Sequence, residues 1–274
     1  MKIYRSTQGI FVEEEGDFFL LDADLAQWDE LIAGSEMKAR ARAACAEKPL
    51  LAPEELLPPV SGQEVWAAGV TYFRSRSARM DESKQVGGDS FYDRVYSAAR
   101  PELFFKATGR RVVGPGAKVR IRSDAHWSVP EPELVLVINA GGEIVGYTVG
   151  NDMSSRDIEG ENPLYLPQAK VYDGSCSVGP CILIAEEPIG QSTGITIEIR
   201  REDMVAFAGY TTLKELKRDP KELVEYLYRD NSFPQGALLF TGTGIVPGND
   251  FTLASGDLIR ITIDGIGTLE NTVA

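Results

Sequence analysis

The sequence predicts an α+β protein rich in β-strands, in which a small N-terminal domain precedes a larger β-roll. Three observations support this class. From residue 101 onward, short apolar runs of strand length recur between turn residues. Helical patterns are few, and they do not alternate with strands as they do in a parallel doubly wound sheet. A proline-rich segment divides the chain into two unequal parts.

The first part, residues 1–60, is expected to form the small α+β domain. Its elements, in order, are strands near residues 2–4, 9–12 and 18–21 and helices near residues 25–33 and 36–46. The segment that follows, 48–60, carries four prolines within eleven positions. Proline fixes φ and removes a backbone donor, so this stretch predicts a stiff linker and excludes a central strand. Residues 61–274 are expected to form the second domain.

The second domain is expected to be mostly strands. Residues 64–72 predict a strand that runs into a loop, and the polar segment 81–89 predicts a mobile loop over a site. Asp219 and Pro220 predict the start of a helix that reaches about Arg229, because aspartate is a favoured N-cap and proline fits the first helical position. The other expected strands lie near residues 104–106, 112–113, 118–121, 134–138, 144–149, 181–185, 196–200, 204–207, 237–241, 258–263 and 265–269.

Composition and charge exclude several classes of protein. The chain has 274 residues, 43% of them hydrophobic, which is enough to bury a large core. Its net charge of −13 would repel nucleic acid phosphates. No signal-peptide pattern follows Met1, and no apolar run approaches the roughly eighteen residues of a membrane span. We therefore expect a cytoplasmic protein with neither nucleic acid nor membrane as a partner.

Catalysis by cysteine or histidine finds little support. The three cysteines, Cys45, Cys176 and Cys181, form no C-x-x-C pair, and free thiols in a reducing compartment are the simplest interpretation. His126 is the single histidine, and we expect it to be exposed in a turn. No G-x-S-x-G motif accompanies it, so neither a thiol nucleophile nor a Ser-His-Asp triad is expected.

An acidic pair stands at the mouth of a strongly apolar strand. Glu131 and Glu133 are two positions apart, so their carboxylates leave the same face of an extended backbone. Pro130 and Pro132 confine this piece to the strand end, and residues 134–138 are apolar on both faces. Buried carboxylates must be paired, protonated or coordinated. The simpler alternative is a solvated strand edge.

A predicted hairpin brings a third carboxylate to this pair. The turn at residues 139–142 should fold 144–149 antiparallel onto 134–138, which returns Asn151 and Asp152 to the neighbourhood of Glu131 and Glu133. Three carboxylates at one point repel one another unless a cation lies among them. Oxygen ligands select a hard ion, Mg²⁺ first, with Mn²⁺ or Ca²⁺ as alternatives. Asp152 could instead cap a helix at residues 154–158.

Three further features bear on chemistry, each with a simpler alternative. Lys170 follows two prolines that we expect to keep residues 166–170 extended; it is either a surface lysine or, beside a metal that lowers its pKa, a base. Glu102 and Lys106 flank an apolar strand and could form an ordinary ion pair. The glycine-rich segment 241–248 could wrap an anion with backbone N–H groups, but it lacks the ending of a P-loop.

The order of these motifs resembles the fumarylacetoacetate hydrolase family, over residue 62 to the C-terminus. The motifs are Gly69-Val70-Thr71-Tyr72, Phe104-Phe105-Lys106, Glu131-Pro132-Glu133, Gly150-Asn151-Asp152-Met153-Ser154-Ser155-Arg156-Asp157 and Gly242-Thr243. The resemblance implies a mixed β-roll catalytic domain with a Mg²⁺, Mn²⁺ or Ca²⁺ site. It assigns Glu131, Glu133 and Asp152 to the metal and Arg156, Lys170 and Thr243 to substrate contact.

Two segments narrow the resemblance to the branch that dehydrates 2-keto-3-deoxy-D-arabinonate. They are residues 159–170, EGENPLYLPQAK, and residues 101–108, PELFFKAT. Hydrolase branches of the family typically carry a histidine and a nearby glutamate after the G-x-x-Y segment to activate water. Residues 73–79 here read FRSRSAR, with neither. A hydrolase would therefore lack its usual base.

The leading hypothesis is a magnesium-dependent hydro-lyase of sugar acid degradation and pentose metabolism. It would remove water from a 2-keto-3-deoxy sugar acid, through a metal-stabilised enolate, to give a dioxo acid such as 2,5-dioxopentanoate. Lys170 would take the C3 proton as base, and Glu102 would assist departure of the hydroxyl as general acid. The residues expected to position the substrate are Thr71, Tyr72, Lys106, Arg156 and Thr243.

Two other functions remain open at this point. One is a metal-dependent C–C hydrolase or decarboxylase of a 2-oxo or β-dicarbonyl acid, of the fumarylpyruvate or oxaloacetate type, because the same chelate supports it. The other is a non-catalytic member of the fold that binds a ligand. In each case we expect a small-molecule 2-oxo acid partner. An oligomer is also expected, because the edges of a β-roll need covering, and the family resemblance implies a homodimer or homotetramer.

Overall fold

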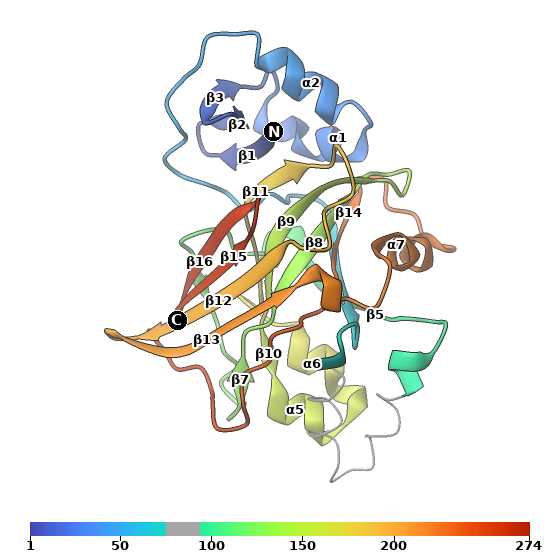
Figure 1. Ribbon diagram of the computed structural model, residues 1–274, viewed down its shortest axis with the longest axis vertical. Helices are drawn as coiled ribbons and strands as arrows, with labels where there is room; N and C mark the ends of the chain where they lie inside the picture. Colours follow the sequence, from blue (N-terminus) through green and yellow to red (C-terminus); the bar gives the residue numbers. More distant parts are fainter. Residues whose placement is uncertain (75–93) are drawn as a thin grey trace.

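The computed structural model describes residues 1–74 and 94–274 (Figure 1). The predicted loop at 81–89 lies outside the described residues. The helices are η1 (Leu25–Gln27), α1 (Trp28–Ala33), α2 (Met37–Ala44), η3 (Gly109–Arg111), α5 (Arg156–Glu161), η4 (Pro163–Tyr165), α6 (Leu166–Lys170), η5 (Leu213–Glu215) and α7 (Pro220–Tyr228). In the part of the chain that the structure describes, no helix is both long and apolar enough to cross a membrane.

A nine-stranded sheet forms the centre of the molecule, in the order β3-β2-β1-β11-β9-β8-β14-β4-β5. Its strands are β1 (Lys2–Ser6), β2 (Gly9–Glu14), β3 (Asp17–Leu20), β4 (Glu64–Gly69), β5 (Glu102–Thr108), β8 (Pro132–Ile138), β9 (Ile144–Asp152), β11 (Cys176–Ile184) and β14 (Ala237–Phe240). All neighbours pair antiparallel except β4 and β14, which are parallel. The sheet is therefore mixed, as predicted.

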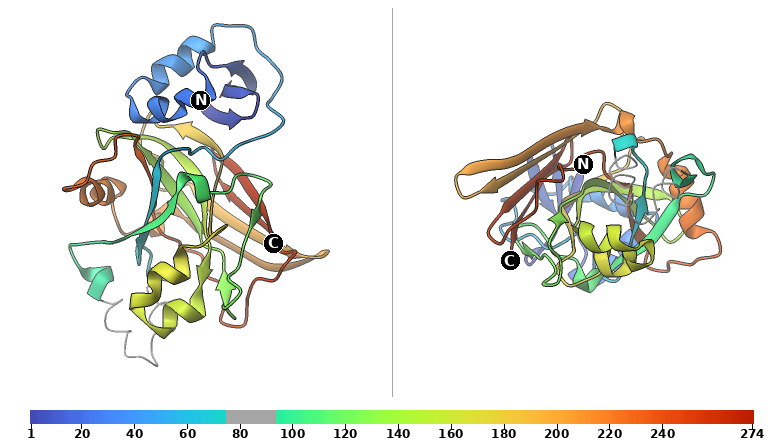
Figure 2. Two further views of the ribbon diagram at one scale, coloured as in Figure 1. Left: turned by 180° about the vertical axis from the view of Figure 1, so that it is seen from behind. Right: turned by 90° about the horizontal axis from the view of Figure 1, so that it is seen from below.

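A second sheet packs against one face of the first. It has five strands, β13 (Met204–Thr212), β12 (Gly194–Arg201), β15 (Leu258–Ile263), β16 (Gly267–Val273) and β6 (Lys118–Val119). A third pairing joins β7 (Ser128–Val129) to β10 (Ser154–Ser155). Figure 2 shows that β1–β3 with α1 and α2 lie at one end of the molecule, and α5 and α6 at the other.

The central sheet is buried on both faces, which explains the unbroken apolar run of β8. Leu134 and Leu136 face a core shared with the second sheet and α7. Val135 and Val137 face a different core, shared with the N-terminal strands and with Trp28 of α1. Alternate residues of a strand point to opposite faces, so a strand covered on both sides is apolar throughout. The side chains of the candidate site leave β8 on the Val135 face.

The N-terminal elements lie close to where the sequence predicted them, but they extend the main sheet. β1 pairs antiparallel with β11, through Lys2 with Leu183 and Ile3 with Ile182. Residues 1–60 thus share one sheet and one core with the remainder of the chain. The division into domains 1–60 and 61–274 stays a prediction.

Most other predicted elements are confirmed, and two predictions are wrong. The α7 helix starts as expected, with the Asp219 side chain accepting from Lys221 N. The predicted strand at 112–113 is only a single bridge from Val113 to Ser177, after η3. The stretch before Lys170 was expected to be extended, but it forms η4 and α6. Its prolines occupy the first turns of these helices, where a missing N–H costs nothing.

Gly150 of β9 offers a test of packing beneath the site. A Cβ atom on Gly150 would lie 2.5 Å from Val135 Cγ2 and would also overlap the Phe240 ring. Gly150→Ala should therefore lower the free energy of unfolding by about 1–3 kcal/mol through overpacking. Urea denaturation measures it. Gly190→Ala is the matched control, because its Cβ would meet nothing nearer than 3.9 Å. Equal stability of the two variants would contradict the packing described.

Candidate active site

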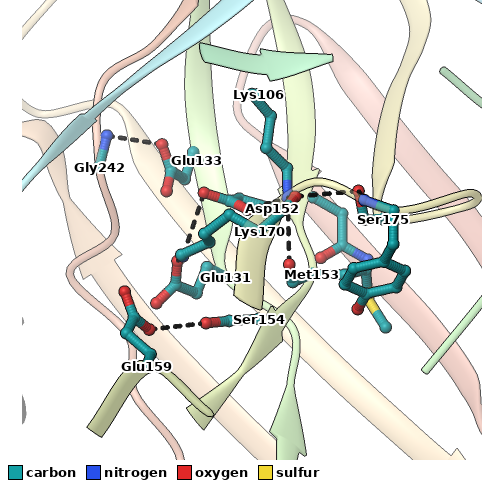
Figure 3. Close-up of polar contacts among 12 residues, drawn as sticks. Lys106, Glu131, Glu133, Asp152, Met153, Ser154, Glu159, Lys170, Ser175 and Gly242 are labelled. Atoms are coloured by element: carbon teal, nitrogen blue, oxygen red, sulfur yellow. Dashed lines mark hydrogen bonds and ion pairs between the residues drawn. The ribbon is translucent and has the colours of Figure 1, made fainter. Parts of the chain in front are cut away.

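The β8–β9 hairpin brings three carboxylates together, as the sequence predicted (Figure 3). Glu131 and Asp152 exchange two backbone hydrogen bonds, of 3.2 and 3.0 Å, so they lie directly opposite each other. Glu133 is two residues along the same strand and shares their face. Ligand oxygens of the three carboxylates lie within 4.8 Å of one another, and all three residues are buried. The alternatives of a solvated strand edge and a helix cap do not describe this cluster.

Asn151, which the hairpin was also expected to deliver, lies on the other face of β9. Its Nδ2 donates to Met153 Sδ over 3.4 Å, and Met153 belongs to the core between the two sheets. The reason is the two-residue period of a strand, which places neighbours on opposite faces. Asn151 is therefore not part of the carboxylate cluster.

Buried cations neutralise two of the three carboxylates. Lys170 Nζ contacts Glu131, and it also lies 3.2 Å from Asp152 Oδ2. Arg156 Nη2 donates to Glu131 Oε1 over 2.5 Å. Lys106 Nζ lies 2.5 Å from Asp152 Oδ1. The side chains of these cations are at most 1% exposed, so their charges are strongly coupled to the carboxylates.

Glu133 has no such counter-ion among the described residues. Its Oε2 accepts a 2.6 Å hydrogen bond from the backbone N–H of Gly242. Burial, and then the negative charges of Asp152 and Glu131, raise the pKa of Glu133 well above its usual value; Lys170 and the Gly242 N–H oppose this only partly. A cation among the three carboxylates would remove this repulsion. The atoms that could bind the metal are all carboxylate oxygens, which are ligands that Mg²⁺ prefers. The residues present therefore fit a divalent metal.

The contact of Gly242 shows which anion the glycine-rich segment 241–248 binds. The sequence predicted that its backbone N–H groups could wrap an anion, and the anion that Gly242 binds is the protein's own Glu133 carboxylate. Gly242 has φ of +90°, and a Cβ atom there would overlap Thr71 Oγ1. Only glycine fits this position comfortably.

Lys170 reaches the cluster from the end of α6. It is fully buried, so the alternative of a surface lysine is wrong. Its Nζ lies 5.8 Å from the centre of the Phe104 ring on β5. Glu102 and Phe104 are two residues apart on β5 and share a face, which turns towards Lys170. Glu102 is half-buried and lies against Gly69 of β4.

Lys106 is fully buried and reaches the cluster from β5. We expected it to contact substrate, or to pair with Glu102. Its ammonium instead contacts Asp152 Oδ1 and donates to the carbonyl oxygens of Met153 (3.1 Å) and Lys170 (2.6 Å). An ammonium has three hydrogens, and two of them go to these carbonyl oxygens, while the charge pairs with Asp152. The structure brings Lys106 into the cluster, and its contact with substrate stays a prediction.

The remaining predicted substrate residues surround Glu133. Thr71 Oγ1 donates to Thr241 O over 2.6 Å, and Thr243 Oγ1 donates to Ile245 O over 3.1 Å. Both hydroxyls thus hold the backbone that presents Gly242. Tyr72 is buried, and burial followed by the charge of Glu133 raises the pKa of its phenol. Direct contact of these residues with substrate stays a prediction.

The buried carboxylate of Glu159 was given no role by the sequence analysis. Glu159 of α5 is 1% exposed and accepts a 3.0 Å hydrogen bond from Ser154 Oγ. Its spacing of three residues from Arg156 puts both side chains on one face of a helix, which was the available signal. His126 is exposed, as expected for a residue without a role in the site. Burial raises the pKa values of the Cys176 and Cys181 thiols to about 12, which disfavours the thiolate that a nucleophile needs.

The fold and this site define a class of metal-dependent enzymes built on a mixed β-roll with a buried carboxylate triad. Residues 73–274 match the model of the fumarylacetoacetate hydrolase C-terminal domain. The chain belongs to the fumarylacetoacetate hydrolase family, as its motifs predicted.

Two relatives are dehydratases by name. The chain is 52% identical, over 78% of its length and 73% of the relative's, to a probable 2-keto-3-deoxyxylonate dehydratase of Haloferax volcanii. It is 46% identical, over 77% of its length and 72% of the relative's, to the 2-dehydro-3-deoxy-D-arabinonate dehydratase of Saccharolobus solfataricus. A solved 2-keto-3-deoxy-D-arabinonate dehydratase complexed with magnesium and 2,5-dioxopentanoate aligns with a TM-score of 0.85 and 35% identity, over 100% of this chain and 98% of that one.

Glu133→Gln should abolish stabilisation by Mg²⁺ without lowering stability when metal is absent. Because burial raises the pKa of folded Glu133, its ionised form opposes folding, and metal-free stability should fall as the pH rises above the ordinary value of 4.5. Glutamine removes this penalty together with one metal ligand. Mg²⁺ at about 100 times its Kd should stabilise the natural protein by about 2.7 kcal/mol.

Thermal melts with and without Mg²⁺ and a chelator measure both effects. Glu47→Gln is the control, because Glu47 is exposed and far from the cluster in sequence. Equal Mg²⁺ shifts in the natural protein and in Glu133→Gln would show that Glu133 is not a ligand.

Proposed function

We propose that this protein is a magnesium-dependent dehydratase that removes water from a 2-keto-3-deoxy sugar acid and releases a dioxo acid. The observation that carries the proposal is the contact of buried Lys170 with two members of the carboxylate cluster, Glu131 and Asp152. The cluster fits a hard cation, and the lysine beside it can exchange a proton. The dehydratases among the relatives support the same reaction.

The metal ligands are Glu131, Glu133 and Asp152. When bound there, a divalent cation supplies a Lewis acid that polarises a carbonyl oxygen. A 2-oxo acid offers a carboxylate and a neighbouring carbonyl as a chelate, so it suits such a centre. Arg156 lies beside Glu131 and orients that ligand, and its charge favours an anionic substrate.

Lys170 acts as the base. Its amine takes a proton from C3, the carbon next to the carbonyl, and the electron pair moves towards the carbonyl oxygen. The hydroxyl on C4 then leaves as water after it receives a proton from Glu102. Tautomerisation gives the dioxo acid, which is 2,5-dioxopentanoate for a five-carbon substrate. The overall change is loss of one water molecule, with no net oxidation or reduction and no external oxidant or reductant.

The surrounding residues position the polar substrate. Thr71, Tyr72 and Thr243 lie on the two loops that meet at Gly242, next to Glu133. Their buried hydroxyls are suited to hydrogen bonds with the hydroxyl groups of a sugar acid. Lys106 serves the site through its contact with Asp152.

The proposal extends to assembly and location. The edge strands of the two sheets are β3, β5, β13 and β6. The β13 edge exposes Met204, Val205 and Tyr210, which favours a homodimer or homotetramer that covers it. The free thiols of Cys176 and Cys181 suit the reducing cytoplasm.

Lys170→Met should lower kcat for a 2-keto-3-deoxypentonate by about 10²–10⁴-fold, because a proton-transfer group is lost while most of the packing is kept. Glu131→Gln should also lose activity, but through weaker Mg²⁺ binding. Proton NMR of the reaction follows the formation of the dioxo acid, and circular dichroism confirms folding.

The same assay separates the proposal from its rivals. Folded Lys170→Met and Glu131→Gln variants that turn over substrate at the natural rate would end the proposal. Release of pyruvate or CO₂ from β-dicarbonyl or oxaloacetate-type acids, without dehydration, would identify a hydrolase or decarboxylase. Mg²⁺ binding without turnover of any 2-oxo acid would identify a binding protein.

Glu102→Gln should lower kcat by about 100-fold while KM changes little, because the amide cannot protonate the leaving hydroxyl. Steady-state kinetics with the same substrate measures both constants. Glu64→Gln on the neighbouring strand β4 is the control, since Glu64 is exposed and bonds to Trp66. A Glu102→Gln variant as active as this control would assign the proton donor elsewhere.

A further inference from the structure

We propose that Lys106 is a positioning residue that locks the metal ligand Asp152 and the base Lys170 into one fixed arrangement. This inference rests on the proposed function and adds a role that the substrate-contact expectation did not contain. Its ammonium is fully buried, and it contacts Asp152 Oδ1 at 2.5 Å, Lys170 O at 2.6 Å and Met153 O at 3.1 Å. One side chain thereby joins the end of β9 to the end of α6.

Strand alternation places Lys106 on the face of β5 that carries Phe104, and a β-bulge lies at this position. In the β4–β5 register, Val65 pairs with Ala107 and Trp66 with Phe105, so Lys106 is the extra residue with no partner on β4. A bulge breaks the strict alternation of a strand and redirects a side chain. Phe104, Ala107 and Val65 all face the core on the cluster side. Lys106 thus shares that face with its apolar neighbours.

The contacts divide the two oxygens of Asp152 between two lysines. Lys106 takes Oδ1, and Lys170 Nζ lies 3.2 Å from Oδ2. The Asp152 carboxylate therefore cannot rotate without losing its bond to Lys106. The second contact fixes the backbone of Lys170 itself, because its carbonyl accepts from the same ammonium. A cation also suits this carbonyl, which lies at the C-terminal end of α6.

A direct role in substrate binding is disfavoured by the burial of the ammonium and by the groups around it. Two of its three hydrogens go to the carbonyl oxygens of Met153 and Lys170, and its charge is paired with Asp152. Residues that orient metal ligands in this way typically contribute about 10–100-fold to metal affinity or activity. We therefore expect the loss of Lys106 to affect Mg²⁺ binding and kcat, and to leave KM nearly unchanged.

The test compares Lys106→Met, which keeps the length of the side chain, with the natural protein. Calorimetric titration should show a Mg²⁺ Kd about 10–100-fold weaker, and kcat at saturating Mg²⁺ should fall by a similar factor. KM should stay within about threefold, because no substrate contact is lost. Lys118→Ala is the matched control, since Lys118 is exposed on β6.

A second variant covers the case in which Lys106→Met does not fold. Lys106→Ala leaves a space in which ethylammonium can replace the missing group. Added ethylammonium should restore at least tenfold of the lost Mg²⁺ affinity and kcat, whereas Lys118→Ala should not respond. A group that only supports the fold would change the melting temperature and would give no rescue of kcat.

Each outcome decides the inference. A raised KM with unchanged Mg²⁺ affinity would make Lys106 a substrate contact and overturn it. Lower melting temperature alone, with normal Kd and kcat in the folded fraction, would overturn it as well. The Mg²⁺ titration needs no substrate, so failure of the natural protein to dehydrate any 2-keto-3-deoxy acid would end the proposed function and still leave the ratio of Kd values to judge Lys106.

Discussion

Carboxylates that share one buried face of a sheet repel one another, and the rest of the site depends on how that repulsion is balanced. Glu131, Glu133 and Asp152 meet because two strands pair directly at their ends. Three cations from other elements then converge on two of them: Lys106, Arg156 and Lys170. Removing one partner from such a buried network leaves an uncompensated charge, which typically costs about 3–5 kcal/mol. The cations and carboxylates therefore depend on each other for their positions.

Among the described residues, no cation balances the negative charge of Glu133. We propose that the function of the site depends on this unbalanced charge. Glu133 has a single backbone N–H as its partner among the described residues, and its pKa is raised by burial and by its acidic neighbours. An arrangement that opposes folding in this way is retained when a ligand offsets it. A divalent cation held by the oxygen ligands already in place would do so, and Lys170, the proposed base, lies beside them. The buried carboxylates whose repulsion opposes folding and the metal site that we propose for catalysis thus lie on the same face of β8.

Much of this was predictable, because it follows from local rules. The two-residue spacing of Glu131 and Glu133, the hairpin that returns Asp152, and the Asp219 cap of α7 depend on residues close together in the chain. The hairpin prediction was wrong for one side chain. It placed Asn151 near the two glutamates, but Asn151 lies on the opposite face of β9 because neighbouring residues of a strand point to opposite sides. Lys170 was matched by resemblance, but its backbone is helical, since proline also suits the first turn of a helix.

Taken alone, the sequence determined the fold class, most strand positions, the carboxylate cluster and the family to which the chain belongs. The tertiary structure decided which cation meets which carboxylate, that β1–β3 extend the central sheet, and that Lys106 contacts Asp152 and the carbonyl oxygen of Lys170. It also decided that the glycine-rich segment binds the protein's own Glu133, 109 positions away. The physical reason is the distance along the chain over which each effect acts. Propensity and alternation act over a few residues, whereas the pairing of buried charges is chosen by the free energy of the whole packed arrangement, and no local pattern records that choice.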